Sequence, residues 1–401
     1  MDNTSSESNY ALPSPTLLSE DVAQKEKANA RIAKAKMEEI LSALKINGHV
    51  RKVSVGPTVT QFEITLEPGV KASKVERNES AIQEALDASS IRLVIPIPGK
   101  NALGIQVPNQ TATPVYMRSL LESKEWNESK ALVPALLGQD IEGKPVILDL
   151  AKAPHLLIAG VAKSEVSACL NTTILSLLFT FSPNELTFLI LAPKNRPLSV
   201  FGQIPHLLVP MVSEPKEYVS TLRWAANEVN RRYKVLAKVK AKNITAFNSR
   251  PTDLQLLTDD NGNVIPQKLP VLVIIISELA DVMITDSTDR EEAEMSICQI
   301  AQNGRAAGIH LVIATQSPRK EVITSLIQAN IPTKIAFRVN DINESRMLLD
   351  MKGAEKLIGN GDMLFNPPDG TPLKRIQSPL VSEDEVSKVV DVVRKQSEEQ
   401  Q

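Results

Sequence analysis

A loop that could hold phosphate follows a short apolar run at residues 155–159. In the pattern GxxxxGK[ST], two glycines let backbone amides surround phosphate groups, the lysine contacts phosphate and the hydroxyl holds magnesium. Residues 160–167 read GVAKSEVS, so the first glycine, Gly160, and the final hydroxyl, Ser167, stand at the required spacing. The second glycine and the lysine are replaced by Glu165 and Val166. The sequence therefore predicts an altered phosphate loop.

The two replacements weaken phosphate binding for different reasons. Val166 cannot donate a charged hydrogen bond, so charge that develops on a transferred phosphoryl group is left unbalanced. Glu165 adds a negative charge beside the loop, and its Cβ resists the close backbone approach that glycine permits. Lys163 and Ser164 are the other polar candidates for contacting a nucleotide. A rescue in which Lys163 replaces the missing cation stays open, although its backbone position is displaced along the loop.

A second candidate site lies where Ser277 and Glu278 follow the apolar run 271–276. An Asp-Glu pair at such a strand end would support magnesium and activate water. Here the base-type carboxylate, Glu278, remains, and an uncharged serine takes the metal-supporting position. Ser167 and Ser277 are thus the candidate magnesium ligands. Strand–turn–helix units with one glycine and one serine also occur in α/β proteins that bind no nucleotide, so these residues alone leave that alternative open.

The elements that would position these residues alternate regularly between residues 131 and 380. Short runs rich in β-branched residues are separated by helical segments, which is typical of a mostly parallel sheet in an α/β domain. Ligands of such domains bind at the carboxyl ends of the strands, near helix N-termini. An amphipathic helix is predicted over residues 382–395. The predicted strands are VILDL, HLLIAG, LTFLILAP, VLVIIIS, IHLVIATQ and TKIAFRV.

A smaller α+β unit is predicted before this domain. Its pattern is a helix at 20–46, two strands around Gly56-Pro57, a helix at 75–89 and the strand IRLVIPI. The segment GIQVPN is predicted as a short edge strand, and residues 114–127 as a polar helix. The predicted boundaries are a disordered, Ser-, Asn- and Pro-rich leader at 1–20, the α+β domain at 21–130 and the α/β domain at 131–401.

Composition bears on three further questions: DNA binding, membrane association and metal or thiol chemistry. The 401 residues carry a net charge of −2, so DNA binding would have to rely on local basic loops. The polar N-terminus lacks a signal peptide, and no apolar stretch is long enough to span a bilayer, so a cytoplasmic protein without a membrane partner is predicted. The four histidines show no metal-ligand spacing, and Cys169 and Cys298 are expected to be buried, inert thiols.

Almost the whole chain resembles the motor of the FtsK/SpoIIIE family of DNA translocases. The resemblance rests on long segments in the family's order, among them GPTVTQFEITLEPGVK, IPIPGKNALGIQVPN, LGQDIEGKPVILDLAKAPHLLIAG, LRWAANEVNRRY, NGRAAGIHLVIATQSP and GAEKLIGNGDMLF. It implies a RecA-like P-loop domain behind a small α+β domain. The family's Walker A glycine and lysine fall on Glu165 and Val166, and its Walker B aspartate falls on Ser277. The family's ATQRPS reads ATQSPR here, which moves the arginine from Ser317 to Arg319.

The resemblance also implies roles for residues that are retained. Glu278, Gln316 and Arg305 match positions of the family's catalytic machinery and subunit contacts, and Arg346 is a further retained arginine. The family uses ATP and magnesium, and the departures imply that binding of both is weak or lost. Double-stranded DNA is the implied partner. Arg290 is the candidate DNA contact because it is the one cation in the loop TDSTDR, residues 285–290.

Three functions remain in view at this stage. The first is a motor-like subunit of a ring, a hexamer in this family, that does not hydrolyse ATP and associates with DNA, as a homo-oligomer or together with an intact homologue, within a process such as chromosome segregation. The second is an active ATP-dependent translocase with a rewired phosphate loop that uses Lys163 and Glu278. The third is a non-catalytic protein-interaction scaffold.

Overall fold

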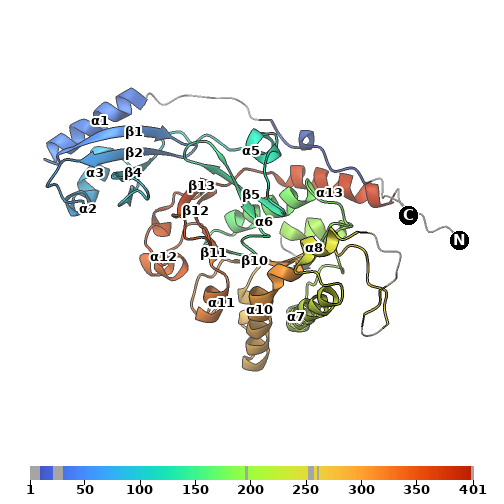
Figure 1. Cartoon of the computed structure of the whole chain (residues 1–401). Coiled ribbons are helices and arrows are strands. Elements are labelled where there is room, and N and C mark those ends of the chain that lie inside the picture. The colour runs from blue at the N-terminus through green and yellow to red at the C-terminus, as the bar shows by residue number, and fades with distance from the viewer. Residues whose placement is uncertain (1–9, 21–29, 195–196, 252–256, 260–261, 399–401) are drawn as a thin grey trace.

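The computed structural model describes residues 10–20, 30–194, 197–251, 257–259 and 262–398. Two β-sheets form within this part of the chain, a four-stranded sheet near the N-terminus and a nine-stranded sheet after it. Figure 1 shows the smaller sheet with its helices at one side of the larger domain. The predicted α/β fold with a preceding α+β domain is therefore confirmed.

The first domain is an antiparallel sheet covered by helices. The strand order is β1-β2-β4-β3, and the core is built from apolar residues of both layers, such as Met37, Ile64 and Ile105. The segment predicted as an edge strand, β4, instead lies between β2 and β3, because its alternate side chains fill this core. The elements are α1 (Ala30–Ala43), β1 (Gly48–Val55), β2 (Val59–Leu66), α2 (Ser73–Arg77), α3 (Glu79–Ala85), β3 (Arg92–Val94) and β4 (Leu103–Pro108).

The large sheet has a parallel half and an antiparallel half. Strands β11, β7, β10, β9 and β8 are parallel neighbours in this order, while β12, β13, β5 and β6 extend the sheet with antiparallel pairing. All six predicted strand segments are strands, but VILDL pairs in an antiparallel hairpin. The strands are β5 (Pro134–Asp140), β6 (Pro145–Asp149), β7 (His155–Ala159), β8 (Leu186–Leu191), β9 (Val271–Ile276), β10 (Ile309–Thr315), β11 (Thr333–Ala336), β12 (Asp362–Asn366) and β13 (Lys374–Gln377).

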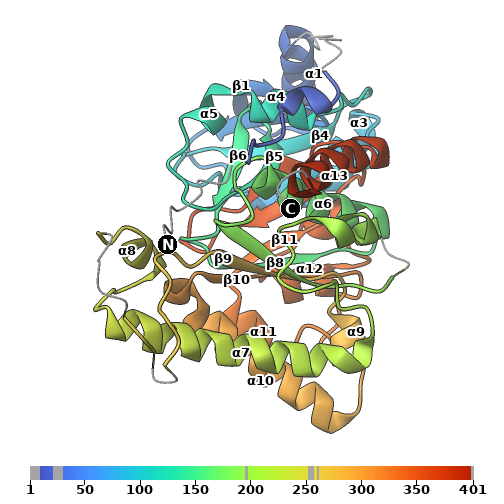
Figure 2. The same cartoon turned by 90° about the vertical axis from the view of Figure 1, so that its right-hand side faces the viewer.

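Helices cover both faces of the large sheet, and each face has its own apolar core. One core joins α6 (Lys163–Leu178), η2 (Pro197–Gln203) and α13 (Glu383–Glu398) to the sheet. The second core lies against the opposite face, where Figure 2 shows α7 and α10 running together. Its helices are α7 (Pro215–Lys238), α9 (Ala280–Met283), α10 (Ser287–Ala307), α11 (Ser325–Asn330) and α12 (Ile342–Leu349).

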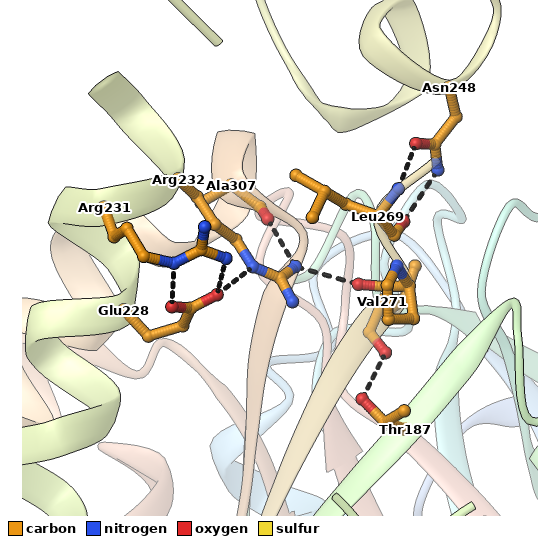
Figure 3. A network of polar contacts seen from close by, with 9 residues as sticks. Thr187, Glu228, Arg231, Arg232, Asn248, Leu269, Val271 and Ala307 are labelled. Carbon is orange, nitrogen blue, oxygen red and sulfur yellow. Dashed lines mark hydrogen bonds and ion pairs between the residues drawn. The ribbon is translucent and has the colours of Figure 1, made fainter. Parts of the chain in front are cut away.

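A buried arginine fixes α7 against the amino ends of the parallel strands (Figure 3). Arg232 is 4% exposed and donates to the carbonyl oxygens of Pro270, before β9, and of Ala307, at the end of α10. Its charge is paired with Glu228, which also pairs with Arg231. Beyond α7, α8 (Ile244–Asn248) is tied to the same region by reciprocal hydrogen bonds between Asn248 and the backbone of Leu269. These hydrogen bonds hold α7, α8 and the end of α10 to the segment that leads into β9.

Packing places the junction between the two domains earlier than the predicted residue 130. Helices α4 (Met117–Leu121) and α5 (Lys124–Asn127) replace the single predicted helix, and Leu120 and Leu121 lie in the core of the large domain. The predicted leader also differs from residue 10 onward. Leu18, which follows η1 (Pro15–Leu17), is buried in that core, and the N–H of Ser19 donates to Glu385 of α13 at 2.6 Å. Residues 1–9 lie outside the described residues.

Two further predictions, on membrane spans and on the two cysteines, can be compared with the described part of the chain. None of its helices combines the length and the apolar character that a membrane span requires. Cys169 and Cys298 are both buried and unbonded, and burial raises the pKa of Cys169 to about 12 and that of Cys298 to about 11. The predicted burial of both thiols is confirmed, and their low reactivity stays a prediction.

Candidate nucleotide site

The altered phosphate loop lies at the carboxyl edge of the parallel strands, between β7 and α6. Gly160 donates its N–H to the carbonyl of Thr315 on β10, and Val161 donates to the carbonyl of Arg338 after β11. A Cβ at position 160 would lie 2.5 Å from the Cβ of Phe337. The retained glycine is therefore required by the close approach of β11, whether or not phosphate binds.

Helix α6 begins at Lys163, so the second half of the predicted loop is wound into its first turn. Ala162 is the N-cap residue and supplies no side-chain capping bond. Lys163 is exposed on this turn, while Val166 is 1% exposed and belongs to the core beneath the helix. The position where the pattern requires a phosphate-binding cation is therefore part of the hydrophobic core.

Glu165 is buried and bonded at the other changed position. Its carboxylate accepts a hydrogen bond of 3.1 Å from the N–H of Gly361. The backbone at Gly359, Asn360 and Gly361 has φ values of +83°, +55° and +86°, and this left-handed bend turns the Gly361 amide toward the helix. Burial raises the pKa of Glu165, and the neighbouring amides oppose this shift because they stabilise the carboxylate.

Glu278 is held on the other side of the loop, between β9 and β10. Its carboxylate accepts hydrogen bonds from the Thr315 hydroxyl at 2.5 Å, the Gln316 N–H at 3.1 Å and the Ala280 N–H at 3.1 Å. The predicted neighbours Glu278 and Gln316 are thus brought together. The bond from Gln316 uses its backbone, so its side chain is not part of this contact.

The two candidate magnesium ligands, Ser167 and Ser277, carry no charge, so a magnesium ion there would lack the carboxylate that usually supports it. Ser277 is buried, and its hydroxyl has no hydrogen-bond partner among the described residues. Ser167 is half-buried in the first turns of α6. Ser167 keeps the hydroxyl that the phosphate-loop pattern uses for magnesium, whereas Ser277 offers an uncharged hydroxyl in place of a carboxylate. In the described part of the chain, histidine, cysteine, aspartate and glutamate form no cluster of three or more that could hold a metal.

A cavity of about 730 Å³ opens beside the first turn of α6. Its lining residues follow β7 and β11, precede β12 and begin at the end of β13, so it lies on the side of the loop away from Glu278, which follows β9. Ser164 and Glu165 line it together with Arg338 after β11, and Thr58 contributes from the first domain. The remaining wall comes from the connector at 112–115 and the segments at 358–361 and 377–381. Lys163 and Ser167 are not among its lining residues.

Behind the cavity, a buried polar network joins the two domains. Arg375 of β13 donates to both carboxylate oxygens of Asp362, at 2.9 and 2.6 Å, and both residues are at most 5% exposed. Arg375 also donates to Gln106 of β4, which accepts from Arg92 of β3 as well, each at 3.1 Å. Burial and the charge of Arg375 lower the pKa of Arg92 to about 10. Asp362 of this network directly follows Gly361, whose N–H binds Glu165, so the turn at 359–361 connects α6 to the contact between the domains.

The other predicted site residues lie apart from this cavity. Arg305, near the end of α10, donates to the carbonyl of Ala151 before β7. Since α10 ends where β10 begins, Arg305 lies at the amino edge of the sheet, opposite the phosphate loop, and the structure does not place it with Glu278. Arg290 is half-buried in the first turn of α10, and Arg346 and Arg319 are exposed.

Sequence reasoning missed the cavity-lining residues that do not belong to the phosphate loop or to α6. Arg338, Glu355, Gln377 and Ser378 come from three segments that are distant along the chain. The Gly-Asn-Gly stretch at 359–361 is the one local signal, because such residues accept left-handed backbone geometry. The sequence alone does not show what this turn faces.

The sheet order, the helices on both faces and the loop at the start of α6 define the fold of a P-loop ATPase. Solved structures agree. TcpA, the conjugation coupling protein of pCW3 solved with ATPγS, has a TM-score of 0.57 at 19% identity, covering 90% of this chain and 99% of its own. The type VII secretion ATPase EccC of Thermomonospora curvata has a TM-score of 0.57 at 21% identity over 70% of this chain and 34% of its own.

The chain belongs to the FtsK/SpoIIIE family. That family's model matches residues 116–320, and the FtsK alpha domain matches residues 12–109. DNA translocase FtsK of Haemophilus influenzae is 42% identical over 89% of this chain and 69% of its own length. FtsK of Clostridium tetani is 43% identical and SftA of Bacillus subtilis 42% identical, each over 96% of this chain. The chain spans 51% and 40% of those two relatives, about half their length.

Proposed function

We propose that this chain is a motor-like subunit that does not hydrolyse ATP and that works with DNA, either in a ring of its own copies or in a mixed ring with an intact homologue. The coarser part of this description, membership of a family of DNA translocases with a P-loop ATPase fold, rests on the comparisons above. Loss of hydrolysis, weak or absent binding of magnesium-ATP, and the ring are the proposal.

One observation carries the proposal: the phosphate-binding cation is replaced by a core residue. Val166 is 1% exposed under α6, so the replacement is built into the packing of the helix. Lost charge contacts to a transferred phosphoryl group typically reduce turnover by about 100- to 1,000-fold each. The neutral Ser277 removes a second contact of this kind, through magnesium. We infer that little turnover remains.

DNA contact is supported by the relatives, which are named as DNA translocases. Arg346 and Arg319 are exposed and available for such contacts, whereas Arg290 is half-buried beside Asp286 and Asp289. Arginine pairs with phosphates and with carboxylates of a neighbouring subunit through its planar fork. We propose the exposed arginines as the first positions to test for contacts with DNA or with a second subunit.

An active translocase is the alternative that one specific observation favours. Glu278 is retained and held rigidly by Thr315 and the backbone of Gln316, as a working base would be. Lys163, exposed at the start of α6, would then have to supply the missing cation. A scaffold that binds neither nucleotide nor DNA is a further alternative, and DNA affinity separates it from the proposal.

DNA-stimulated ATP hydrolysis tests the proposal directly. The wild type and Glu278→Gln should give the same background rate, with and without duplex DNA, because the substitution changes a carboxylate that no longer acts. An intact family member serves as the positive control. Turnover of about 1 s⁻¹ or more that Glu278→Gln abolishes would establish the active translocase instead. Fluorescence anisotropy with labelled duplex DNA, which we expect to show binding, distinguishes the scaffold.

A further inference from the structure

Helices α7 and α10 form an exposed face on the large domain. They run side by side in the same direction, because Arg223 of α7 pairs with Glu292 of α10 and, farther along both helices, the Tyr233 hydroxyl donates to the carbonyl of Asn303 (Figure 2). Each helix buries one side in the core against the sheet and keeps its opposite side exposed. We call this exposed side the α7/α10 face. The exposed positions that define it are Trp224, Asn227, Lys234, Glu291, Met295 and Gln302.

The middle of the α7/α10 face carries two large apolar side chains. Trp224 is 45% exposed and Met295 is 69% exposed. Trp224 directly follows Arg223, and Met295 is three residues beyond Glu292, so the pair lies at nearly the same level of the two helices. Tryptophan and methionine are enriched in the centre of protein interfaces, where charged residues are depleted. The middle of the face therefore suits a protein partner.

The start of the α7/α10 face is acidic. Residues 286–294 contain five carboxylates and a single cation, Arg290, which is half-buried. Glu292 and Glu294 are already bonded within the domain. A helix dipole favours acids only in the first turn, and Glu291 lies beyond the first turn of α10, so capping does not account for it. The acidic cluster consists of the three exposed residues Asp286, Asp289 and Glu291.

The end of the α7/α10 face is basic. Residues 234–242 contain four lysines and no acid, and all four lysines are exposed. Lysines complement the dipole at the end of a helix, but α7 ends at Lys238, so Lys240 and Lys242 lie beyond it. Because α7 and α10 run in the same direction, these lysines lie at the opposite end of the face from the acidic cluster. The basic cluster consists of Lys234, Lys238, Lys240 and Lys242.

The α7/α10 face is large enough for a stable protein contact. The 24 residues of α7 give it a length of about 36 Å, and two helices of about 10 Å diameter give it a width of about 20 Å. The resulting area of about 700 Å² is close to the ~800 Å² that each partner contributes to a standard interface. The net charge of −2 is too small to keep two copies of the chain apart.

A second copy of this chain, laid antiparallel on the α7/α10 face, matches it at both ends. Each acidic cluster then faces the other copy's basic cluster, and the apolar residues lie between them. A DNA duplex would match the basic cluster but would be repelled by the acidic one. We propose that the α7/α10 face is a two-fold contact between two copies of this chain. This goes beyond the proposed function, since a two-fold contact closes with two copies, whereas a ring is built from head-to-tail contacts.

Sedimentation velocity of the full chain tests the contact through its charges. The wild type should form dimers at about 0.1 M salt and dissociate at about 1 M, where the screening length falls from ~10 to ~3 Å. One variant, Lys234→Glu with Lys240→Glu, reverses the basic cluster, and another, Asp289→Lys with Glu291→Lys, reverses the acidic cluster. Each places like charges opposite one another and should weaken the dimer by about tenfold or more. An equimolar mixture of the two variants should regain the dimer, because opposite charges then meet at both ends.

Two further variants complete the experiment. Lys124→Glu with Lys130→Glu is the matched control, because it makes the same change of charge at exposed positions in and after α5, which packs on the other face of the sheet. It should leave the dimer unchanged. Trp224→Ala should weaken the dimer by about tenfold or more, since tryptophans at the centre of an interface dominate its affinity. Circular dichroism and urea unfolding check that each variant is folded, as exposed substitutions should be.

Several results would overturn the two-fold contact. They are a monomeric wild type at about 0.1 M salt and about 100 μM chain, a dimer that neither cluster reversal weakens, and a mixture of the two reversed variants that stays monomeric. Loss of duplex DNA binding on reversal of the basic cluster, with an unchanged dimer, would assign that cluster to DNA instead. Larger assemblies that survive both reversals would support the ring and overturn this contact. ATP turnover that depends on Glu278 would overturn the proposed function and leave the contact standing.

Discussion

Returning a lysine to position 166 should destabilise the fold without restoring nucleotide binding. Val166 is 1% exposed and packs in the core between α6 and the sheet. The substitution Val166→Lys replaces a compact apolar side chain by a long one with a terminal charge. The side chain must either stay in the core, with its ammonium desolvated, or force the first turn of α6 to move.

The expected magnitude follows from this burial. Loss of a fully buried valine costs about 1.5–3 kcal/mol, and overfilling a packed core typically costs a further ~1–3 kcal/mol. The sum of about 2.5–6 kcal/mol is a large share of the ~5–15 kcal/mol by which a typical domain is stable. Val166→Met isolates the effect of size, because methionine is long and adaptable but uncharged. We expect it to cost clearly less than Val166→Lys.

Urea unfolding followed by circular dichroism and tryptophan fluorescence measures both variants, and titration with magnesium-ATP measures binding. Lys163→Ala, at an exposed position of the same turn, should change stability by less than about 0.5 kcal/mol. If Val166→Lys were as stable as the wild type and gained affinity for magnesium-ATP, the lysine would have reached a working phosphate site. The conclusion that position 166 now serves the core would then be refuted.

Further predictions concern buried ionisable groups. Asp362→Asn leaves the buried Arg375 without its counter-charge and should cost about 3–5 kcal/mol in urea unfolding, whereas an unchanged midpoint would show that the pair contributes little. Since burial raises the pKa of Glu165, its contribution to stability is present below pH 4.5 and is lost as the pH rises, so Glu165→Gln should gain stability relative to wild type at pH 7 and not at pH 4. Burial lowers the pKa of the three buried histidines to between about 3 and about 4, from 6.5, so unfolding should become easier as pH falls below 6.5, by about 2 kcal/mol for each histidine at pH 5; a flat profile would contradict this. Cys169 and Cys298 should react with a thiol reagent at pH 8 only after unfolding, and fast labelling of the native chain would show that the thiols are accessible.

The sequence was a good guide to the elements of the large domain and to the position of the phosphate loop. The runs of β7, β9 and β10 are continuously apolar and short, which predicts strands buried on both faces of a sheet. The turn that follows β7 begins with a glycine, Gly160. The strands β12 and β13 were not predicted from periodicity, because they pair in an antiparallel extension whose partners are far apart along the chain.

The chemistry of the altered site was harder to predict, because it depends on contacts between distant segments. Nothing near Glu165 in the sequence identifies the Gly361 amide as its partner. The buried position of Val166 follows from where α6 begins, and helix starts are poorly fixed by sequence when no capping side chain is present. Arg305, identified through the family motif, proved to lie at the opposite edge of the sheet.

The cavity beside α6 has a consequence for the first domain. Thr58 contributes to its wall from that domain, and the segments at 358–361 and 377–381 reach the buried network of Arg92, Gln106 and Arg375. An occupant therefore touches surfaces that exist together only while the two domains are docked. By thermodynamic linkage, whatever factor docking adds to the occupant's affinity, the occupant adds to the docking equilibrium. A small molecule in this cavity would therefore stabilise the docked arrangement of the two domains reversibly, to an extent set by its concentration.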